Sequence, residues 1–357
     1  MKYIEPFRDM LSVRKISDEI IKTSTKTWNI MEICGGQTHS IIRNSLDEML
    51  QQCVRFIHGP GCPVCVTPAE MIDKAVELAI SDKVTLCCFG DIMKVPGTKY
   101  SLAKARSLKG RVKYYYAPLE ALEFAKSNPD KEIVFFLSGF ETTAPITALL
   151  MLKAREEKIS NFSVLACHFL VPPAIDALMQ IPELKIDALL AAGHVCTISG
   201  TESYRKISEK YKIPVIITGF EPADIILAVK NAVNALENKE YCVINQYKRS
   251  VKENGNIEAL KAMETVLEVS DQEWRGLGTI PSSGLRIRKE FDAFNASKKF
   301  TIISSKTSEE QCPLGKILSG LMKPSECPFY AKTCTPANPI GAPMVSSEGA
   351  CAAYFSR

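Results

Sequence analysis

The most constraining feature of the sequence is a series of short apolar runs, most of which end in glycine and which alternate with helical stretches. Seven occur in the first 220 residues: WNIMEICGG, CVRFIHGPG, VTLCCFGD, KEIVFFLSGF, FSVLACHFL, DALLAAGHV and IPVIITGF. Runs that are apolar on both faces and alternate with helices are typical of a buried parallel sheet, so the pattern predicts an α/β architecture. Ligands of such sheets gather at the carboxyl ends of the strands, where the Gly, Cys, His and Glu residues of these runs fall.

The runs predict two similar α/β domains around a cleft, followed by a smaller domain rich in Cys and Pro. FFLSGFETTAPITALLM and VIITGFEPADIILAV each read as a strand, a Gly-Phe-Glu turn and a helix, so the same device occurs twice. We expect the N-terminal helix in residues 1–26 to pack near the third domain. The expected boundaries are 27–128 for the first α/β domain, 129–238 for the second and 239–357 for the third.

Composition excludes several classes of function. Of the 357 residues, 46% are apolar and 24% are charged, and a net charge of +4 without a long basic block argues against nucleic acid as a partner. No apolar run approaches the roughly 18 residues of a membrane helix, and the N-terminus lacks the apolar core of a signal peptide. We therefore expect a cytoplasmic protein with no membrane partner. Thirteen cysteines in such a compartment indicate metal binding or thiol chemistry.

The stretch MEICGGQTHS places Cys34 at the end of a strand and beside a glycine pair. If Thr38 or Ser40 caps the following helix, the thiol lies near the amides of a helix N-terminus, which lower a thiol pKa and favour the thiolate. A buried structural cysteine is the alternative interpretation. His39 follows Cys34 by five residues and could supply a second ligand, a proton or a hydrogen bond to sulfur.

The stretch HGPGCPVCVTPAE contains the pair Cys62 and Cys65 behind a Gly-Pro-Gly turn. Thr67, Pro68 and Glu70 read as the N-cap, N1 and N3 positions of a helix, which predicts a capping box. A C-x-x-C pair in a tight turn beside a helix N-terminus suits reversible disulfide formation. We favour this interpretation over half of a zinc site, because a zinc site would need a second pair at comparable spacing.

The last 46 residues contain four cysteines and six prolines, so little regular structure can form there. Four thiolates on irregular loops suit either a Cys-ligated iron–sulfur cluster or a structural zinc ion, and buried structural cysteines are a third possibility. Their wide spacing does not choose between the two metals, although Cys-Pro occurs twice, as in ferredoxin runs. The four candidate ligands are Cys312, Cys327, Cys334 and Cys351.

Three further side chains follow strand-end glycines and would face the cleft between the two α/β domains. Glu141, His194 and Glu221 could hydrogen-bond a ligand there, or they could cap helices. The remaining cysteines lie inside apolar runs and read as buried small hydrophobic residues. These are Cys53, Cys87, Cys88, Cys167, Cys196 and Cys242.

At least seven unusual motifs make the chain resemble the HypD family of hydrogenase maturation factors, from about residue 29 to residue 355. The motifs are ICGGQTH, GPGCPVC, SGFETTAP, AGHV, GFEPADII, EWRGLGTIPSSGL and the ending ECPFYAKTCTPANPIGAPMVSSEGACAAYF. The resemblance implies two similar α/β domains and a third domain with a [4Fe–4S] cluster. It also implies a scaffold, rather than a conventional turnover enzyme, that assembles the Fe(CN)2CO group of [NiFe]-hydrogenases. The implied partners are the small protein HypC and the cyanide carrier HypE, with HypF upstream.

The same resemblance implies a role for each cysteine site. Cys34 would be the iron-binding thiolate, shared with a cysteine of HypC; Cys62 and Cys65 would be the dithiol/disulfide, and the four C-terminal cysteines the cluster ligands. Ferrous iron accepts thiolate and imidazole ligands, so Cys34 with His39 nearby suits it. Our hypothesis is that the cluster feeds or resets the Cys62/Cys65 pair. Two alternatives are a free-standing iron–sulfur thiol–disulfide oxidoreductase and a binding module whose C-terminal segment holds zinc.

Overall fold

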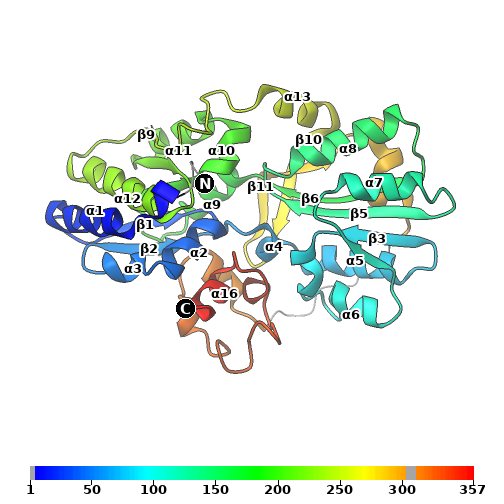
Figure 1. Ribbon diagram of the computed structural model, residues 1–357, viewed down its shortest axis with the longest axis horizontal. Helices are drawn as coiled ribbons and strands as arrows, with labels where there is room; N and C mark the ends of the chain where they lie inside the picture. The colour runs from blue at the N-terminus through cyan, green and yellow to red at the C-terminus, as the bar shows by residue number, and fades with distance from the viewer. Residues whose placement is uncertain (1–4, 303–310) are drawn as a thin grey trace.

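The computed structural model describes residues 5–302 and 311–357, which form two β-sheets flanked by helices and a C-terminal segment below them (Figure 1). The first sheet has the strand order β2-β1-β7-β8-β9 and the second the order β10-β11-β6-β5-β3-β4. The first-sheet strands are β1 Trp28–Glu32, β2 Val54–His58, β7 Ala188–Ala192, β8 Val215–Thr218 and β9 Val243–Asn245. The second-sheet strands are β3 Val84–Cys88, β4 Val112–Tyr114, β5 Glu132–Gly139, β6 Phe162–Phe169, β10 Leu267–Trp274 and β11 Gly278–Ile287.

Helices connect and cover these strands. The α-helices up to the end of β6 are α1 Met10–Thr23, α2 Gly35–Arg43, α3 Leu46–Met49, α4 Pro63–Val66, α5 Ala69–Ile80, α6 Leu102–Ser107, α7 Leu119–Lys126 and α8 Ala144–Glu156. Those that follow are α9 Val171–Leu178, α10 Gly193–Ser199, α11 Glu202–Tyr211, α12 Pro222–Glu237, α13 Ile257–Val266, α14 Ala296–Lys299, α15 Leu314–Leu318 and α16 Ala350–Phe355. The 3-10 helices are η1 Glu5–Arg8, η2 Gly90–Lys94, η3 Lys289–Phe294, η4 Pro324–Glu326 and η5 Ala342–Met344.

The predicted α/β architecture is confirmed, since each of the seven apolar runs forms a strand. All pairings in the first sheet are parallel, and those among β3, β4, β5 and β6 are parallel as well. The two Gly-Phe-Glu segments are strand-turn-helix units, β5 with α8 and β8 with α12. One unit lies in each sheet, so in both sheets a Gly-Phe-Glu turn follows the carboxyl end of a parallel strand.

Strand pairing divides the chain differently from the contiguous domains expected at 27–128, 129–238 and 239–357. β1 and β2 pair within the same sheet as β7, β8 and β9, whereas β3 to β6 pair within the same sheet as β10 and β11. The chain therefore crosses between the sheets three times. Residues 267–287 fall within the expected third domain and form the hairpin of β10 and β11. It joins the second sheet instead, because β11 pairs with β6 in antiparallel orientation.

The N-terminal helix also lies elsewhere than expected. α1 packs along α12 beside the first sheet rather than against the C-terminal segment (Figure 1). Val13 and Ile20 bury their side chains in that contact, and Lys230 Nζ of α12 lies 2.5 Å from Glu19 Oε2. The amphipathic pattern of this helix specified a buried face but not the element that covers it.

Alternating residues of each sheet contribute to two different cores. Ile30 and Leu190 of the first sheet face an outer core with α1, α2 and α12, while Phe135 of the second sheet faces an outer core with α7, α8 and α13. The opposite faces, including Met31 and Phe136, meet in one central core between the sheets. The carboxyl ends of strands from both sheets are therefore held close together.

The C-terminal segment, residues 311–357, covers the edge of the first sheet at β2. Gly320 has a φ of +76°, and a Cβ on it would lie 2.2 Å from Ile57 Cγ2, so only glycine fits this approach. At the end of the chain, α16 packs against α2, and the Arg357 guanidinium pairs with Asp47 at 2.8 Å. Within residues 5–302 and 311–357, no helix combines the length and apolarity needed to cross a bilayer.

Candidate functional site

The Cys34 turn begins where β1 ends. Cys34 is itself the N-cap of α2, and its carbonyl oxygen accepts hydrogen bonds from the amides of Gln37 and Thr38. The prediction that Thr38 or Ser40 caps this helix was therefore wrong. The Thr38 hydroxyl instead donates to Glu32 Oε1 at 2.5 Å, beneath the turn.

The surroundings of Cys34 oppose the thiolate form that the sequence predicts. Burial raises the pKa of the Cys34 thiol, whose residue is only 4% exposed, and the carboxylates of Glu348 and Glu32 raise that pKa further. The amides of Gly36 and Gln37 lower it but do not overcome this shift. A bound cation would offset these effects, because metals bind the deprotonated sulfur.

Three segments meet at Cys34 with their backbones in direct contact. The amide of Gly35 donates to the carbonyl oxygen of Gly61 at 3.0 Å. A Cβ on Gly61 would lie 2.3 Å from Cys34 Cα, and a Cβ on Gly35 would lie 2.1 Å from the carbonyl oxygen of Glu348. The glycines of the C-G-G and G-P-G motifs therefore bring the strand end, the C-x-x-C loop and the C-terminal segment together.

The C-x-x-C loop lies on the connection by which the chain leaves the first sheet. Cys62 and Cys65 form a disulfide, with Cys62 as the N-cap of the short helix α4. The capping box expected around Thr67 does not form, since α5 begins at Ala69 and Pro68 occupies its N-cap position. The Thr67 hydroxyl instead donates to the carbonyl oxygen of Pro63 at 2.8 Å, which ties it to the loop.

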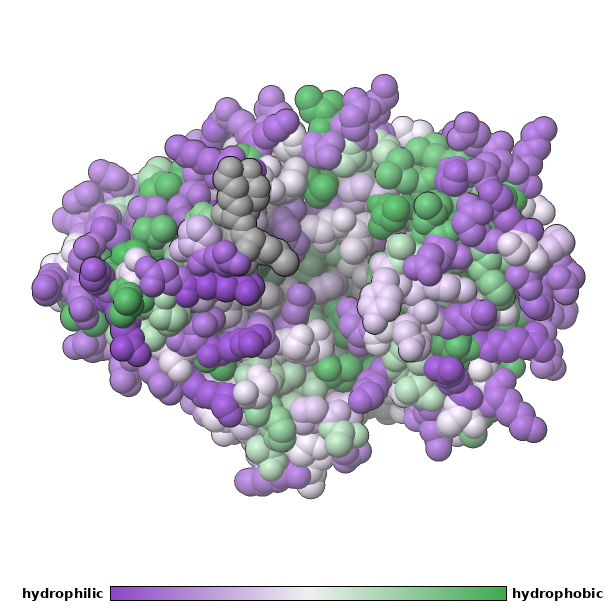
Figure 2. All heavy atoms as spheres, viewed as in Figure 1, coloured by the Kyte–Doolittle hydropathy of each residue, from purple (hydrophilic) through white to green (hydrophobic). Residues whose placement is uncertain are grey.

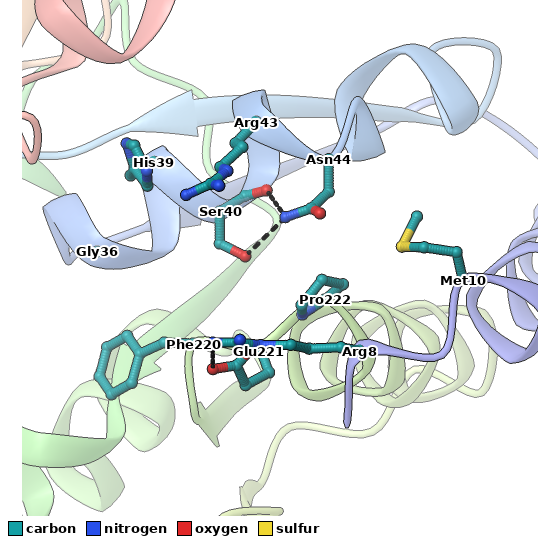
Figure 3. Close-up of a pocket in the computed structure, with 10 residues that line it drawn as sticks. All are labelled: Arg8, Met10, Gly36, His39, Ser40, Arg43, Asn44, Phe220, Glu221 and Pro222. Atoms are coloured by element: carbon teal, nitrogen blue, oxygen red, sulfur yellow. Dashed lines mark hydrogen bonds and ion pairs between the residues drawn. The ribbon is translucent and has the colours of Figure 1, made fainter. Parts of the chain in front are cut away.

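A pocket of about 350 Å³ opens beside the Cys34 turn (Figure 3). His39 and Arg43 of α2 line one wall, and Phe220 and Glu221 at the start of α12 line the facing wall. Glu221 caps α12 and pairs with Arg8 at 2.6 Å, so it is held by two interactions. In Figure 2 the middle of the visible face is mostly pale, while the surrounding surface carries many purple hydrophilic side chains interrupted by green hydrophobic patches.

The expected cleft residues separate into two groups. The His194 ring packs at a tilt against Phe220, with ring centroids 4.9 Å apart, and lies on the first-sheet side with His39 and Glu221. Glu141 lies on the second-sheet side, is 3% exposed, and accepts a hydrogen bond from the Val171 amide at 2.9 Å. Burial raises the pKa of Glu141 to about 7.

Buried polar atoms without a partner concentrate around Cys34. Nearly all buried polar groups in proteins are hydrogen-bonded, so such atoms indicate places where a ligand or water binds. Seven occur among the described residues, and five belong to elements that surround the site. These five are Gln37 Oε1, His39 Nδ1, Glu141 Oε2, His194 Nδ1 and the Tyr204 hydroxyl.

The four C-terminal cysteines line one small cavity. Burial raises the pKa of Cys351, and the neighbouring thiols of Cys312, Cys334 and Cys327 raise that pKa further. A Cβ on Gly341 would lie 2.4 Å from Cys312 Sγ, so this glycine leaves room at the cavity wall. The sequence-predicted ligand set is therefore brought together from three loops and α16.

Four thiols around one cavity are the donor set that a Cys-ligated iron–sulfur cluster would take. A [4Fe–4S] cluster binds its four thiolates through four different irons, so its ligands stand farther apart than those of tetrahedral zinc. Among the described residues, no group of three or more His, Cys, Asp or Glu side chains is arranged to hold a metal ion.

One short helix separates this cavity from the disulfide. Gly341, Pro343 and Met344 line the cysteine cavity, and η5, which contains the last two, packs against α4. Ala342 of η5 belongs to the same buried core as Cys62 and Cys65. The disulfide therefore lies between the Cys34 turn and the wall of the cysteine cavity.

Sequence reasoning missed four residues of this site. Glu32 and His58 were read only as strand residues, although an acid and a histidine at the ends of adjacent buried strands signal a polar site. Tyr204 carried no signal in the sequence. Glu348 lies in the motif MVSSEGAC, and a motif so close to a candidate ligand cysteine could have drawn attention to it.

Comparisons with known proteins show the family of the chain. The family model described as "Hydrogenase formation hypA family" (HypD) matches residues 11–357. The "Hydrogenase maturation factor HypD" of Rhodobacter capsulatus is 43% identical over 368 residues, which cover 99% of this chain and 98% of that protein. The protein of the same name from Escherichia coli K12 is 38% identical, over 99% of this chain and 98% of its own length. The "Hydrogenase expression/formation protein HupD" of Azotobacter chroococcum is 42% identical, over 100% of this chain and 97% of its own length. The chain therefore belongs to the HypD family of hydrogenase maturation factors.

Proposed function

We propose that the protein is the scaffold on which the Fe(CN)2CO group of [NiFe]-hydrogenases is assembled, with the iron held at Cys34. One observation carries this proposal. The Cys34 turn, the C-x-x-C loop and the C-terminal segment are in backbone contact through Gly35 and Gly61. The thiol of Cys34, the Cys62–Cys65 pair and the segment with the four C-terminal cysteines therefore adjoin one another. A Cys34 that was only a buried structural residue would not require this arrangement.

Iron is the cargo of this site. Binding of Fe2+ by Cys34 releases the thiol proton, and the positive charge of the metal offsets the burial that keeps the thiol neutral. The unpartnered Nδ1 atoms of His39 and His194 and the unpartnered hydroxyl of Tyr204 are available nearby. Cyanide nitrogens accept hydrogen bonds, so these groups suit an iron that carries cyanide. His39 also remains a candidate second ligand.

The Cys62–Cys65 disulfide supplies the redox component. Its reduction consumes two electrons and two protons and yields two thiols, and the reverse step returns them. A [4Fe–4S] cluster on Cys312, Cys327, Cys334 and Cys351 would supply electrons one at a time. The packing of η5 between the cysteine cavity and α4 supports this assignment, because it leaves only one short helix between the two centres.

Partners follow from the family and from the open pocket. A small HypC-like protein would share the iron through a cysteine of its own, and a HypE-like carrier, charged by a HypF-like enzyme, would deliver cyanide. The pocket beside Cys34 gives a partner access to the turn from the side of His39 and Arg43 (Figure 3). Among the thirteen cysteines, Cys62 and Cys65 form the one disulfide pair, which suits assembly in the reducing cytoplasm.

The alternative function, a free-standing thiol–disulfide oxidoreductase, is less well supported by the geometry. Cys62 is 4% exposed and Cys65 is fully buried. Thiol–disulfide exchange requires access of the attacking thiolate to a disulfide sulfur. A protein substrate reaches this pair only if the loop rearranges, and a partner cysteine likewise reaches Cys34, which is also 4% exposed, only if the turn opens. A redox role toward the adjacent Cys34 site needs no access of a protein to the disulfide itself.

The proposal is tested by the iron content of the protein co-produced with its HypC-like partner and purified anaerobically. We expect one iron per chain beyond the iron matched by acid-labile sulfide. Cys34→Ala should lose that extra iron and keep the sulfide-matched iron. The control is Cys53→Ala, equally buried at 4% exposure but located in the outer core of the first sheet. Equal extra iron in the two variants would contradict the proposal.

A further inference from the structure

We infer that Glu32, His58 and Tyr354 form a buried positioning relay, by which docking of the C-terminal segment holds the Cys34 turn in place. The three side chains come from β1, β2 and α16. They connect the helix that carries Cys351 to the turn that carries Cys34. None of them is a candidate metal ligand, so their role is to position other groups.

An unbroken series of hydrogen bonds joins the two ends. The Tyr354 hydroxyl lies 3.0 Å from His58 Nε2, and His58 Nδ1 lies 2.6 Å from Glu32 Oε1. The other carboxylate oxygen, Oε2, accepts from the amide of Cys34 at 3.1 Å. The Tyr354 ring also packs edge-on against His58, with centroids 5.5 Å apart.

The Glu32 carboxyl group joins the turn to the histidine. It accepts from the Cys34 amide and the Thr38 hydroxyl, and its Oε1 lies against His58 Nδ1. His58 is hydrogen-bonded at both ring nitrogens, to Glu32 through Nδ1 and to Tyr354 through Nε2. Each member therefore fixes the orientation of the next.

Burial makes this series sensitive to the loss of any one member. Glu32 is fully buried and His58 is 7% exposed, so neither can turn to water if its partner is removed. Buried polar networks are rigid when every member is satisfied and costly when one is not. His58 also directly precedes the Gly-Pro-Gly turn of the C-x-x-C loop, so the relay touches the segments of all three cysteine sites.

The contact between α16 and the first sheet has a second, independent anchor. The Arg357 guanidinium bonds both carboxylate oxygens of Asp47, at 2.8 and 3.1 Å, and contacts Glu48 at 2.9 Å. This ion pair ties the residue just beyond α16 to α3, and its hydrogen bonds do not include Glu32, His58 or Tyr354. Its removal therefore separates general docking of α16 from the specific action of the Tyr354 hydroxyl.

The test measures how often the turn opens. Full-length protein is purified anaerobically with its disulfide intact, and alkylation of Cys34 by iodoacetamide is followed by peptide mass spectrometry. Cys34 is 4% exposed, so its alkylation reports local opening. Tyr354→Phe keeps the ring and removes one hydrogen bond, and we expect roughly fivefold faster alkylation. Arg357→Ala, the matched control, should leave the rate within about twofold.

Variants at His58 provide a second, conservative comparison. His58→Ala should accelerate alkylation of Cys34 more than Tyr354→Phe does, because it leaves Glu32 without its donor. His58→Asn retains an amide donor near the position of Nδ1 and should restore most of the protection. Equal rates for Tyr354→Phe, Arg357→Ala and the unaltered protein would overturn the relay. So would His58→Asn behaving like His58→Ala.

The inference rests on the proposed function only in taking Cys34 as the iron-binding residue. Alkylation needs no partner protein and no hydrogenase, so failure of the relay can be told apart from failure of the assembly proposal. If Cys34→Ala kept the extra iron while Cys34 was alkylated faster in Tyr354→Phe, the assembly proposal would fail and the relay would stand. Unchanged alkylation in that variant would remove the relay and leave the assembly proposal intact.

Discussion

Gly61 lies directly against the backbone of the Cys34 turn, and its replacement by alanine gives the sharpest structural prediction. A Cβ there would lie 2.2 Å from the carbonyl oxygen of Ile33 and 2.3 Å from Cys34 Cα. Both are backbone atoms, so no side chain can rotate away. The overlap is relieved only if the C-x-x-C loop and the Cys34 turn move apart.

The expected magnitude follows from two opposing effects. Overpacking of a buried position costs about 1–3 kcal/mol, while alanine lowers the entropy of the unfolded chain and returns about 0.4–1 kcal/mol. We expect Gly61→Ala to lower the free energy of unfolding by about 1.3 kcal/mol, the difference between the midpoints of these two ranges. Separation of the loops should also expose Cys34 and speed its alkylation.

Urea unfolding followed by circular dichroism measures this loss, with Gly90→Ala as the control. A Cβ on Gly90 would meet nothing closer than 4.0 Å, and this glycine is exposed. Gly90→Ala should therefore be neutral or stabilising by up to about 1 kcal/mol. If the two variants unfold at the same urea concentration, the close approach of the loops at Cys34 is refuted.

Three further predictions concern the buried acid, the disulfide and the cysteine cavity. Burial raises the pKa of Glu141 to about 7, so the unaltered protein loses stability as the pH rises from about 4 to 7. Glu141→Gln removes this dependence. In denaturation at pH 5 and pH 8, the free energy of unfolding of Glu141→Gln should exceed that of the unaltered protein by an amount that grows to about 3 kcal/mol at pH 8. An equal difference at the two pH values would contradict the raised pKa of Glu141. Replacing Cys62 or Cys65 by serine should leave the iron and sulfide of the C-terminal segment in place yet stop maturation, and loss of sulfide would show that the ligands are wrongly assigned. Gly341→Ala should reduce sulfide-matched iron because its Cβ would lie 2.4 Å from Cys312 Sγ, and full retention of iron would argue against the cavity as the cluster site.

Strands and their ends were predictable because local chemistry decides them. The apolar runs formed strands, and Cys34, Glu141, His194 and Glu221 all follow strand ends, as the glycine-terminated runs indicated. Sheet membership was not predictable in the same way. It depends on contacts between segments far apart in the chain, such as β1 with β7. Ile30 of β1 pairs with Ala188 of β7, and nothing in the sequence around either residue indicates that the two strands pair.

The chemistry of the site shows the same limit. A cysteine at a strand end was visible in the sequence, but its pKa depends on burial and on Glu348, more than 300 residues later. The capping box at Thr67 was a sound local pattern that tertiary contacts overrode, since its hydroxyl bonds Pro63 and meets Ser138. Local patterns identified the candidate site residues, and long-range packing determined their pKa values and hydrogen-bond partners.

Infrared spectroscopy of the protein co-produced with its HypC-like and HypE-like partners tests the central claim most directly. We predict cyanide and carbon monoxide stretching bands on the purified complex, absent from Cys34→Ala and retained in Cys53→Ala. Bands of equal intensity in Cys34→Ala, or iron bound at Cys34 without any diatomic bands, would contradict assembly of the Fe(CN)2CO group at this site.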